Sequence, residues 1–408
     1  MKRADIHAPG EQTVRSPVNS DPPQARQVTK EDWLEGPNIT WSLQHTSQFF
    51  PTRQVTRATA VAELPVDLKD LDNLPFEDSL KDLIFFGEFI RRTDTDAIIV
   101  LHKGKIIYER YENGMTPETR HLLFSASKSF LGLVTAVMVS QGMIGENDSI
   151  SHCVPELAAS AYSDATLRQV LDMRVGVKFS EAEEDYTDLE SDIVNYLRAA
   201  DWVSRLNYQG PTDLHAALLS LKELEGPHGG NFCYKSPCSD VLAWVLSKAS
   251  GKSLSELLSE LIWSKIGSER EAYYLVDPLG KEAAFGGLNV TLRDFARFGE
   301  MMRQMGNWHG CQVVPENVVK DIMNGGDCEV FANGNRADTR PGWSYRSHWW
   351  ITHNRNGAYA AFGVHGQWLY IDPKAQFVVA KFGSQLEPSD ASIDALHLKA
   401  FEALATAL

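Results

Sequence analysis

A serine and a lysine stand three residues apart at the start of an apolar stretch, HLLFSASKSFLGLVTAVMVSQG, residues 121–142. Residues three apart share one face of a helix, so the Ser125 hydroxyl and the Lys128 amine would be neighbours in a helix that begins near Ser125. An ammonium among apolar side chains loses hydration, which disfavours its charged form. A neutral lysine could take the serine proton, while N–H groups at the helix N-terminus stabilise an oxyanion. The pattern indicates a nucleophilic serine with a lysine base.

The Ser-x-x-Lys pattern alone also has structural interpretations. A chain of this length contains about one such match by chance, and Lys128 could extend outward from a core helix into water. Two further segments favour a catalytic interpretation. Tyr234 and Ser236 lie in a loop just before an apolar helix in FCYKSPCSDVLAWVL. In AFGVHGQWLYIDP, Gly363 interrupts a strand and would let backbone approach a ligand closely.

In this order and spacing, Ser-x-x-Lys, Tyr-x-Ser and a glycine on a C-terminal strand make the sequence similar to the serine β-lactamase and penicillin-recognising superfamily. The segments TWSLQHTSQFFPTR and GVHGQ narrow the resemblance to its class C-like esterases and amidases, a branch that includes nylon-oligomer hydrolases. The resemblance covers roughly residues 36–400. It implies a hydrolase that forms an acyl-enzyme with carboxylic esters or small linear amides, including 6-aminohexanoate-type oligoamides.

The resemblance implies a catalytic role for each matching residue. Ser125 would be the nucleophile and Lys128 its base. Tyr234 would be a second proton-relay residue, hydrogen-bonded to both. The backbone N–H groups of Ser125 and Val364 would form the oxyanion hole.

Two positions depart from the pattern of the family. Ser236 stands where many relatives have asparagine, and Ala361-Phe362-Gly363 stands where they have Lys-Thr-Gly or His-Thr-Gly. Ser236 and Gly363 are still expected to contact substrate. The missing cation or imidazole weakens any prediction that the chain handles the carboxylate of a β-lactam. A β-lactamase or D,D-peptidase therefore ranks below an esterase or amidase.

An acidic segment, FSEAEEDYTDLESD at residues 179–192, contains seven carboxylates. Such runs are most often solvated surface loops, although their charge would also attract a substrate with an ammonium end. The resemblance implies in addition that Tyr186 closes over the substrate and contacts the scissile amide. His365 is interpreted as a structural hydrogen-bonding residue rather than as a general base.

Strand patterns lie at both ends of the chain and helix patterns in its middle. Residues 96–114 predict a hairpin around Lys103-Gly104, and residues 359–383 predict adjacent antiparallel strands, whereas 41–55 indicates irregular structure. Helices are predicted at 239–251, 253–267, 291–306 and 389–408. Together they predict an α/β (α+β), β-lactamase-like fold, in which an antiparallel sheet from both chain ends is flanked by helices and a mostly helical lobe is inserted.

The predicted domain spans residues 31–408, after a disordered tail at residues 1–30. Its α/β lobe would comprise about residues 31–125 and 285–408, and its helical lobe about residues 126–284.

The composition limits the classes of partner that we expect for this chain. The net charge is −15 with no Lys/Arg-rich run, so nucleic acid is not expected. The chain has neither a signal-peptide pattern nor a long apolar stretch, so we expect a cytoplasmic protein that does not bind a membrane. Cysteine and histidine spacings predict no metal site, and no cofactor is expected. The expected partner is a small-molecule ester or amide substrate. The oligomeric state stays open, with a homodimer as one alternative, and a catalytically silent ligand-binding relative is the alternative outside enzymes.

Overall fold

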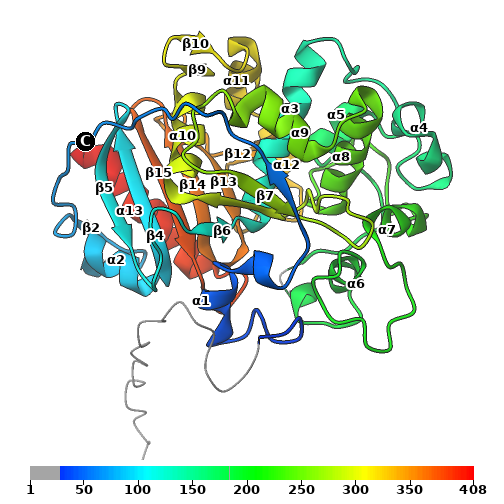
Figure 1. Cartoon of the computed structure of the whole chain (residues 1–408), viewed down its shortest axis with the longest axis horizontal. Helices are drawn as coiled ribbons and strands as arrows, with labels where there is room; N and C mark the ends of the chain where they lie inside the picture. The colour runs from blue at the N-terminus through cyan, green and yellow to red at the C-terminus, as the bar shows by residue number, and fades with distance from the viewer. Residues whose placement is uncertain (1–27, 183) are drawn as a thin grey trace, which may run out of the picture.

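The computed structural model describes residues 28–182 and 184–408, and its centre is a seven-stranded antiparallel sheet (Figure 1). The strand order is β11-β12-β13-β14-β15-β4-β5, so strands from the two chain ends meet where β15 pairs with β4. The strands are β4 (Thr95–His102), β5 (Lys105–Tyr111), β11 (Ser344–Arg346), β12 (Trp349–Ile351), β13 (Tyr359–Gly363), β14 (Gln367–Asp372) and β15 (Phe377–Gly383). The predicted sheet from both chain ends is confirmed.

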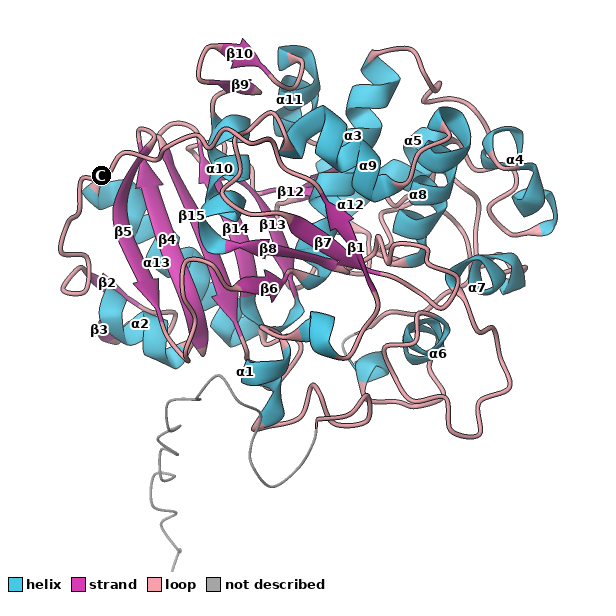
Figure 2. Cartoon of the chain, viewed as in Figure 1, coloured by secondary structure: helices cyan, strands magenta, loops and turns pink. Residues whose placement is uncertain are grey.

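Both faces of this sheet are covered by helices (Figure 2). Successive strand residues point to opposite faces, and in β4 Ile98 joins the apolar cluster that includes Phe89 of α2 (Phe86–Arg92) and Phe401 of α13 (Ala391–Ala407). Its neighbour Ile99 joins the cluster on the other face, where α10 (Leu292–Arg303) packs. Burial on both faces explains why β4 is apolar along almost its whole length.

The hairpin at residues 96–114 turns where it was predicted. Lys103 has φ 51° and Gly104 has φ 79°, and these two residues link β4 to β5. Positive φ at both central residues is typical of the two-residue turns that match the twist of paired strands. The antiparallel strands predicted at 359–383 are also confirmed, as β13, β14 and β15.

A second sheet of four strands was not predicted. Its order is β1-β7-β8-β6, with β1 (Thr52–Val55), β6 (Arg120–Leu122), β7 (Ala272–Leu275) and β8 (Leu288–Thr291). The prediction of irregular structure at 41–55 is therefore wrong for the last four residues, although the short α1 (Asn38–Ser42) and a 3-10 turn precede them. Only Val55 of β1 is buried, so the strand lacks the alternation that identifies strands in a sequence. Two small hairpins complete the strands: β2 (Pro75–Glu77) with β3 (Leu83–Phe85), and β9 (Asn307–Trp308) with β10 (Cys311–Gln312).

The middle of the chain is mostly helical, as predicted. Its helices are α3 (Ser127–Ser140), α4 (Ile150–Cys153), α5 (Leu167–Leu171), α6 (Asp192–Ala199), α7 (Leu214–Ser220), α8 (Pro237–Ser250) and α9 (Leu254–Leu258), and α11 (Glu316–Asn324) and α12 (Cys328–Ala332) follow later. The helix predicted at 239–251 is α8, which begins with a proline and ends at Gly251 with φ 70°. The one predicted at 253–267 is α9 continued by a π-helical turn at Ser259–Trp263, and those at 291–306 and 389–408 are α10 and α13.

The predicted disordered tail falls mostly on residues 1–27, which lie outside the described residues. The last three residues of that range are described: Val28 is buried, and Lys30 forms an ion pair with Asp201. Within residues 28–182 and 184–408, none of the helices is both long and apolar enough to cross a membrane.

Candidate active site

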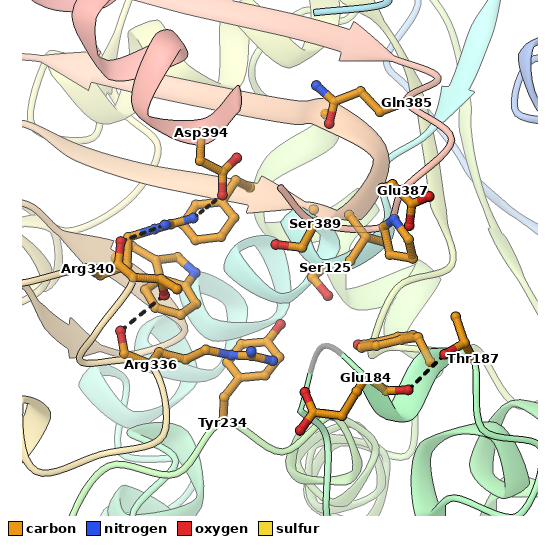
Figure 3. Close-up of a pocket in the computed structure, with 18 residues that line it drawn as sticks. Ser125, Glu184, Thr187, Tyr234, Arg336, Arg340, Gln385, Glu387, Ser389 and Asp394 are labelled. Carbon is orange, nitrogen blue, oxygen red and sulfur yellow. Dashed lines mark hydrogen bonds and ion pairs between the residues drawn. The ribbon is translucent and has the colours of Figure 1, made fainter. Parts of the chain in front are cut away.

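Ser125 lies at a sharp turn before α3. It is the middle residue of a 3-10 turn, Phe124–Ala126, that runs directly into the helix, and Phe124 has φ 44°. A non-glycine residue with positive φ marks a constrained turn. The side chain of Ser125 lines a cavity of about 260 Å³ (Figure 3).

Lys128 reaches back to this serine. Its Nζ lies 2.9 Å from Ser125 Oγ and donates a second hydrogen bond to the Phe285 carbonyl at 2.5 Å. The side chain is 1% exposed, and in the described part of the chain it forms no ion pair. The predicted contact between serine and lysine is confirmed, and both of its hydrogen-bond partners are uncharged oxygens.

α3 packs closely against the segment before β12 because Gly132 has no side chain. A Cβ at this position would lie 2.0 Å from the Ser347 carbonyl oxygen. The adjacent Ser129 hydroxyl donates to the His348 carbonyl at 2.6 Å. α3 is therefore held against the segment that leads into β12, which fixes the direction in which Lys128 points.

Asp240 on α8 holds the segment that receives the lysine. Its Oδ1 accepts the Ala284 N–H at 2.8 Å and its Oδ2 accepts the Tyr196 hydroxyl at 2.7 Å, directly beside the carbonyl of Phe285. Burial raises the pKa of Asp240 to about 7, against the effect of these hydrogen bonds and of the Lys128 charge. Asp240 was not predicted as a site residue, because an aspartate inside an apolar helix gives no motif.

Tyr234 lies beside Lys128, but not as predicted. Lys128 Nζ is 5.2 Å from the centre of the Tyr234 ring, and among the described residues no hydrogen bond joins the Tyr234 hydroxyl to Ser125 or Lys128. Figure 3 shows the hydroxyl end of the ring directed toward Ser125. The Arg336 guanidinium lies 5.5 Å from the centre of the same ring. The residue is in the cavity wall, with its hydroxyl available to a substrate.

The end of β13 packs against the backbone that carries the serine. A Cβ on Gly363 would lie 2.3 Å from the Leu123 carbonyl oxygen and 2.9 Å from the Ser125 nitrogen. The expectation that Gly363 permits a close backbone approach is confirmed for the protein's own chain, and Gly363 also lines the cavity. Val364, the next residue, lines the cavity together with Ser125.

Ser236 does not line the cavity of about 260 Å³ described above, called the larger cavity from here on. Its hydroxyl donates to Glu181 Oε1 at 2.7 Å, and its N–H donates to Glu181 Oε2 at 2.6 Å. The Tyr186 hydroxyl donates to the same Oε1 at 2.7 Å. Glu181 therefore holds both predicted substrate-binding residues, and Ser236 lines a second, smaller cavity beside Ser125. Burial and the nearby Glu181 charge raise the pKa of Tyr186 far above its usual range.

The acidic loop is only partly the solvated surface that its composition predicts. Glu181 is 1% exposed and fully hydrogen-bonded, and Asp185 accepts hydrogen bonds from Ser180 and Ala182 within the loop. Of the loop carboxylates that the structure describes, Glu184 lines the larger cavity. Glu183 lies outside the described residues. The charge that a substrate meets is thus smaller than a count of carboxylates indicates.

His365 is a buried structural residue. Its Nδ1 is 2.7 Å from the Gln385 carbonyl oxygen, and its ring lies 5.1 Å from that of Phe124. Burial lowers the pKa of His365 to about 4, which keeps the ring neutral near pH 7. These contacts support the predicted structural role.

The cavity beside Ser125 is also lined by four charged side chains from late in the chain, which were not predicted. They are Arg336, Arg340, Glu387 and Asp394. Arg340 forms an ion pair with Asp394 at 2.5 Å and lies 4.8 Å from the Phe362 ring centre. Two arginines from another segment thus line the cavity, although the third motif has no cation. In the part of the chain that the structure describes, no cluster of side chains suits a metal ion.

Comparison with known proteins places this geometry in a family. The model of the Beta-lactamase family matches residues 86–402. A 6-aminohexanoate-dimer hydrolase from Paenarthrobacter ureafaciens is 33% identical over 376 residues, which cover 92% of this chain and 93% of that protein.

Solved structures agree. A Bacillus anthracis protein assigned as a 6-aminohexanoate-dimer hydrolase superposes with a TM-score of 0.87 at 32% identity, covering 95% of this chain and 98% of that one. A family VIII carboxylesterase shares the fold at a TM-score of 0.55 and 14% identity, over 75% of this chain and 92% of that one. The predicted β-lactamase-like fold is confirmed, and the chain is a hydrolase that belongs to the beta-lactamase family.

Proposed function

We propose that the protein is a serine hydrolase that cleaves carboxylic esters and small linear amides through an acyl-enzyme on Ser125. The observation that carries the proposal is the 2.9 Å contact between Lys128 Nζ and Ser125 Oγ in the wall of a cavity. A hydroxyl within hydrogen-bond reach of a buried amine is the arrangement that an activated nucleophile requires.

The proposed reaction has two halves. In the first, Ser125 Oγ attacks the substrate carbonyl carbon and its proton passes to Lys128. The bond to the alcohol or amine then breaks, and this leaving group takes the proton from Lys128, either directly or through the Tyr234 hydroxyl. In the second half, water attacks the acyl-enzyme, releases the carboxylic acid and restores the Ser125 hydroxyl.

The backbone would stabilise the negative charge that forms on the carbonyl oxygen. We assign this role to the N–H groups of Ser125 and Val364, because Gly363 brings the end of β13 into contact with the Ser125 peptide. Backbone donors need no particular side chain, so the departure from the family's third motif leaves them in place.

The names of the relatives suggest linear amides of 6-aminohexanoate as one group of substrates. A carboxylate end of such a substrate would lie in the larger cavity, whose lining includes Arg336 and Arg340. β-Lactam hydrolysis is the second candidate, since the matching family model is that of the Beta-lactamase family.

Labelling with a fluorophosphonate probe, followed by mass spectrometry, tests the nucleophile. The wild type should gain one adduct on Ser125, and Ser125→Ala should neither label nor hydrolyse p-nitrophenyl acetate. Ser140→Ala, at the opposite end of α3, is the matched control and should behave as the wild type. Activity of Ser125→Ala within tenfold of the wild type would exclude the assignment. A chromogenic β-lactam in the same assay separates the two candidate functions.

A further inference from the structure

Ser125 lies at the junction of two cavities. Besides the larger cavity, a smaller one of about 50 Å³ opens beside it, and Ser125, Tyr186 and Val364 line both. A substrate carbonyl held between Ser125 and Val364 therefore has one cavity on each side. Each side of the scissile bond would occupy one of them.

The smaller cavity is enclosed mainly by aromatic and aliphatic side chains. The side chains that enclose it include Trp33, Phe124, Ile193, Leu197, Trp202 and Phe285. Trp202 lies 4.7 Å from Phe285 between ring centres, and the Trp33 indole N–H donates to the Trp202 carbonyl at 3.0 Å. The segment before α1 thus closes a cavity whose other walls come from α6 and from the turn that carries the serine.

Three polar side chains of this cavity have hydrogen-bond partners in the protein, whereas the Trp202 indole N–H has none among the described residues. Ser236 and Tyr186 donate to Glu181, and His365 is hydrogen-bonded to the Gln385 carbonyl. The lining includes no aspartate, glutamate, lysine or arginine. The carboxylate behind the lining, Glu181, already accepts hydrogen bonds from Ser236 and Tyr186. A charged end of a substrate would lose its hydration here and meet no charged side chain in the lining, which is unfavourable.

The position of Tyr234 assigns the two cavities to the two halves of a substrate. Tyr234 lines the larger cavity and not the smaller one. Because the leaving group must receive its proton on the side of Tyr234 and Lys128, it departs through the larger cavity. The smaller cavity remains for the acyl half.

We propose that the smaller cavity is an acyl subsite for a short, uncharged, unbranched alkyl chain. This inference rests on the proposed function and narrows its substrate class to acyl groups without a terminal charge, with polar or charged groups confined to the leaving half. Of the amides that the names of the relatives suggest, it excludes those whose acyl half is a 6-aminohexanoyl group with a terminal ammonium. Each methylene that enters the cavity should raise kcat/KM about three- to fourfold, the equivalent of about 0.8 kcal/mol.

Two isomeric esters distinguish the halves of the substrate. Ethyl hexanoate places its long chain on the acyl side and hexyl acetate places it on the alcohol side. The wild type should prefer ethyl hexanoate at least tenfold in kcat/KM, and it should hydrolyse ethyl 6-aminohexanoate, which ends in an ammonium, at least tenfold less well than ethyl hexanoate.

Substitutions of Leu197 on α6 test the cavity itself, because this partly buried side chain can be enlarged or shortened. Leu197→Trp should lower the ratio of kcat/KM for ethyl hexanoate over hexyl acetate at least tenfold, and Leu197→Ala should move the preference toward longer acyl chains. Leu189→Trp is the matched control, since Leu189 is 61% exposed and lines neither cavity. It should leave the ratio unchanged.

The outcomes separate this inference from the one on which it rests. Equal rates on the isomers in the wild type, a ratio that Leu197→Trp does not move, or a preference for the ammonium-ended ester would overturn the acyl subsite while hydrolysis still depends on Ser125. A wild type that hydrolyses neither isomer nor p-nitrophenyl acetate would overturn the proposed function itself.

Discussion

The carboxylate of Glu181 accepts both hydrogen bonds that Ser236 offers, one from its hydroxyl at 2.7 Å and one from its N–H at 2.6 Å. Ser236 is two residues beyond Tyr234, and Glu181 also holds the Tyr186 hydroxyl. One buried carboxylate therefore connects the acidic loop to the segment that carries the tyrosine next to Lys128. The loop and the catalytic segment are expected to move together.

Glu181→Gln should loosen this connection. A glutamine offers one oxygen and one NH2 group, so an NH2 would face a backbone N–H or a hydroxyl hydrogen. Loss of charge-assisted hydrogen bonds should lower the free energy of unfolding by about 1–3 kcal/mol, and kcat/KM for an amide should fall at least tenfold. Urea unfolding and steady-state kinetics measure both effects. Glu190→Gln, at an exposed position of the same loop, is the control, and equal behaviour of the two variants would contradict the proposed connection.

Lys128→Arg should be inactive at every pH at which the fold persists. The guanidinium keeps the positive charge but does not deprotonate in proteins, so it would not accept the Ser125 proton. Loss of at least a thousandfold in kcat with p-nitrophenyl acetate is expected, of the size that follows removal of a base from a nucleophile pair. The exposed Lys178→Arg should retain full activity. A working Lys128→Arg enzyme would mean that position 128 supplies only charge.

Tyr186→Phe should separate amides from esters. The Tyr186 hydroxyl gives its hydrogen to Glu181, so its oxygen remains free to accept a hydrogen bond from the N–H of a scissile amide. An ester has no such N–H. Hexanoyl p-nitroanilide should therefore lose about tenfold more kcat/KM than p-nitrophenyl hexanoate, roughly the effect of one hydrogen bond. Equal losses on both substrates would show that the tyrosine only packs the loop. Tyr208→Phe, whose hydroxyl is 3.4 Å from the Asn195 carbonyl oxygen on α6, controls for loss of a phenol hydroxyl.

Lys381 in β15 should make stability depend on pH. It is completely buried, with Nζ 3.2 Å from the Gly366 carbonyl oxygen, and burial lowers its pKa to about 7. In the unfolded chain a lysine keeps its proton to about pH 10. Between these limits the unfolded state binds more protons, so this residue makes stability rise with pH from about 7 to 10, and below pH 7 its full destabilisation is present.

Lys381→Met removes this dependence. The variant should be more stable than the wild type at pH 6, and its advantage should shrink by at least about 1 kcal/mol by pH 9. Urea unfolding at the two pH values measures the difference, and the exposed Lys374→Met should show no such change. A constant advantage across the range would mean that Lys381 stays charged in the folded protein.

The parts of the site that the sequence predicts are those encoded locally. Ser125 and Lys128 lie within one helical turn, and the hairpin at 96–114 carries its own turn residues, so neither depends on distant contacts. The resemblance to a family added Tyr234 and Gly363, whose contacts span long stretches of chain. The resemblance also predicted hydrogen bonds from the Tyr234 hydroxyl to Ser125 and Lys128, and among the described residues the structure shows neither.

The missed parts depend on tertiary contacts. Glu181 looks like its acidic neighbours in the sequence, and it is buried only because Ser236 meets it from 55 residues away. Asp240 gives no motif, since its partners Ala284 and Tyr196 come from other segments. β1 forms because β7 offers it an edge, not because TRQV alternates. Local patterns carry no information on such pairings.

The pairing of β15 with β4 has a consequence for folding during synthesis on the ribosome. β4 pairs with β5 and β15, and β15 is synthesised long after β4. Contacts between segments so distant in the chain form late, and Gly363, which meets the Ser125 peptide, is likewise synthesised long after Ser125. A nascent chain therefore contains Ser125 long before the site is complete. Until β15 is synthesised, the hairpin of β4 and β5 exposes an apolar strand edge, which is the kind of surface that chaperones protect from aggregation.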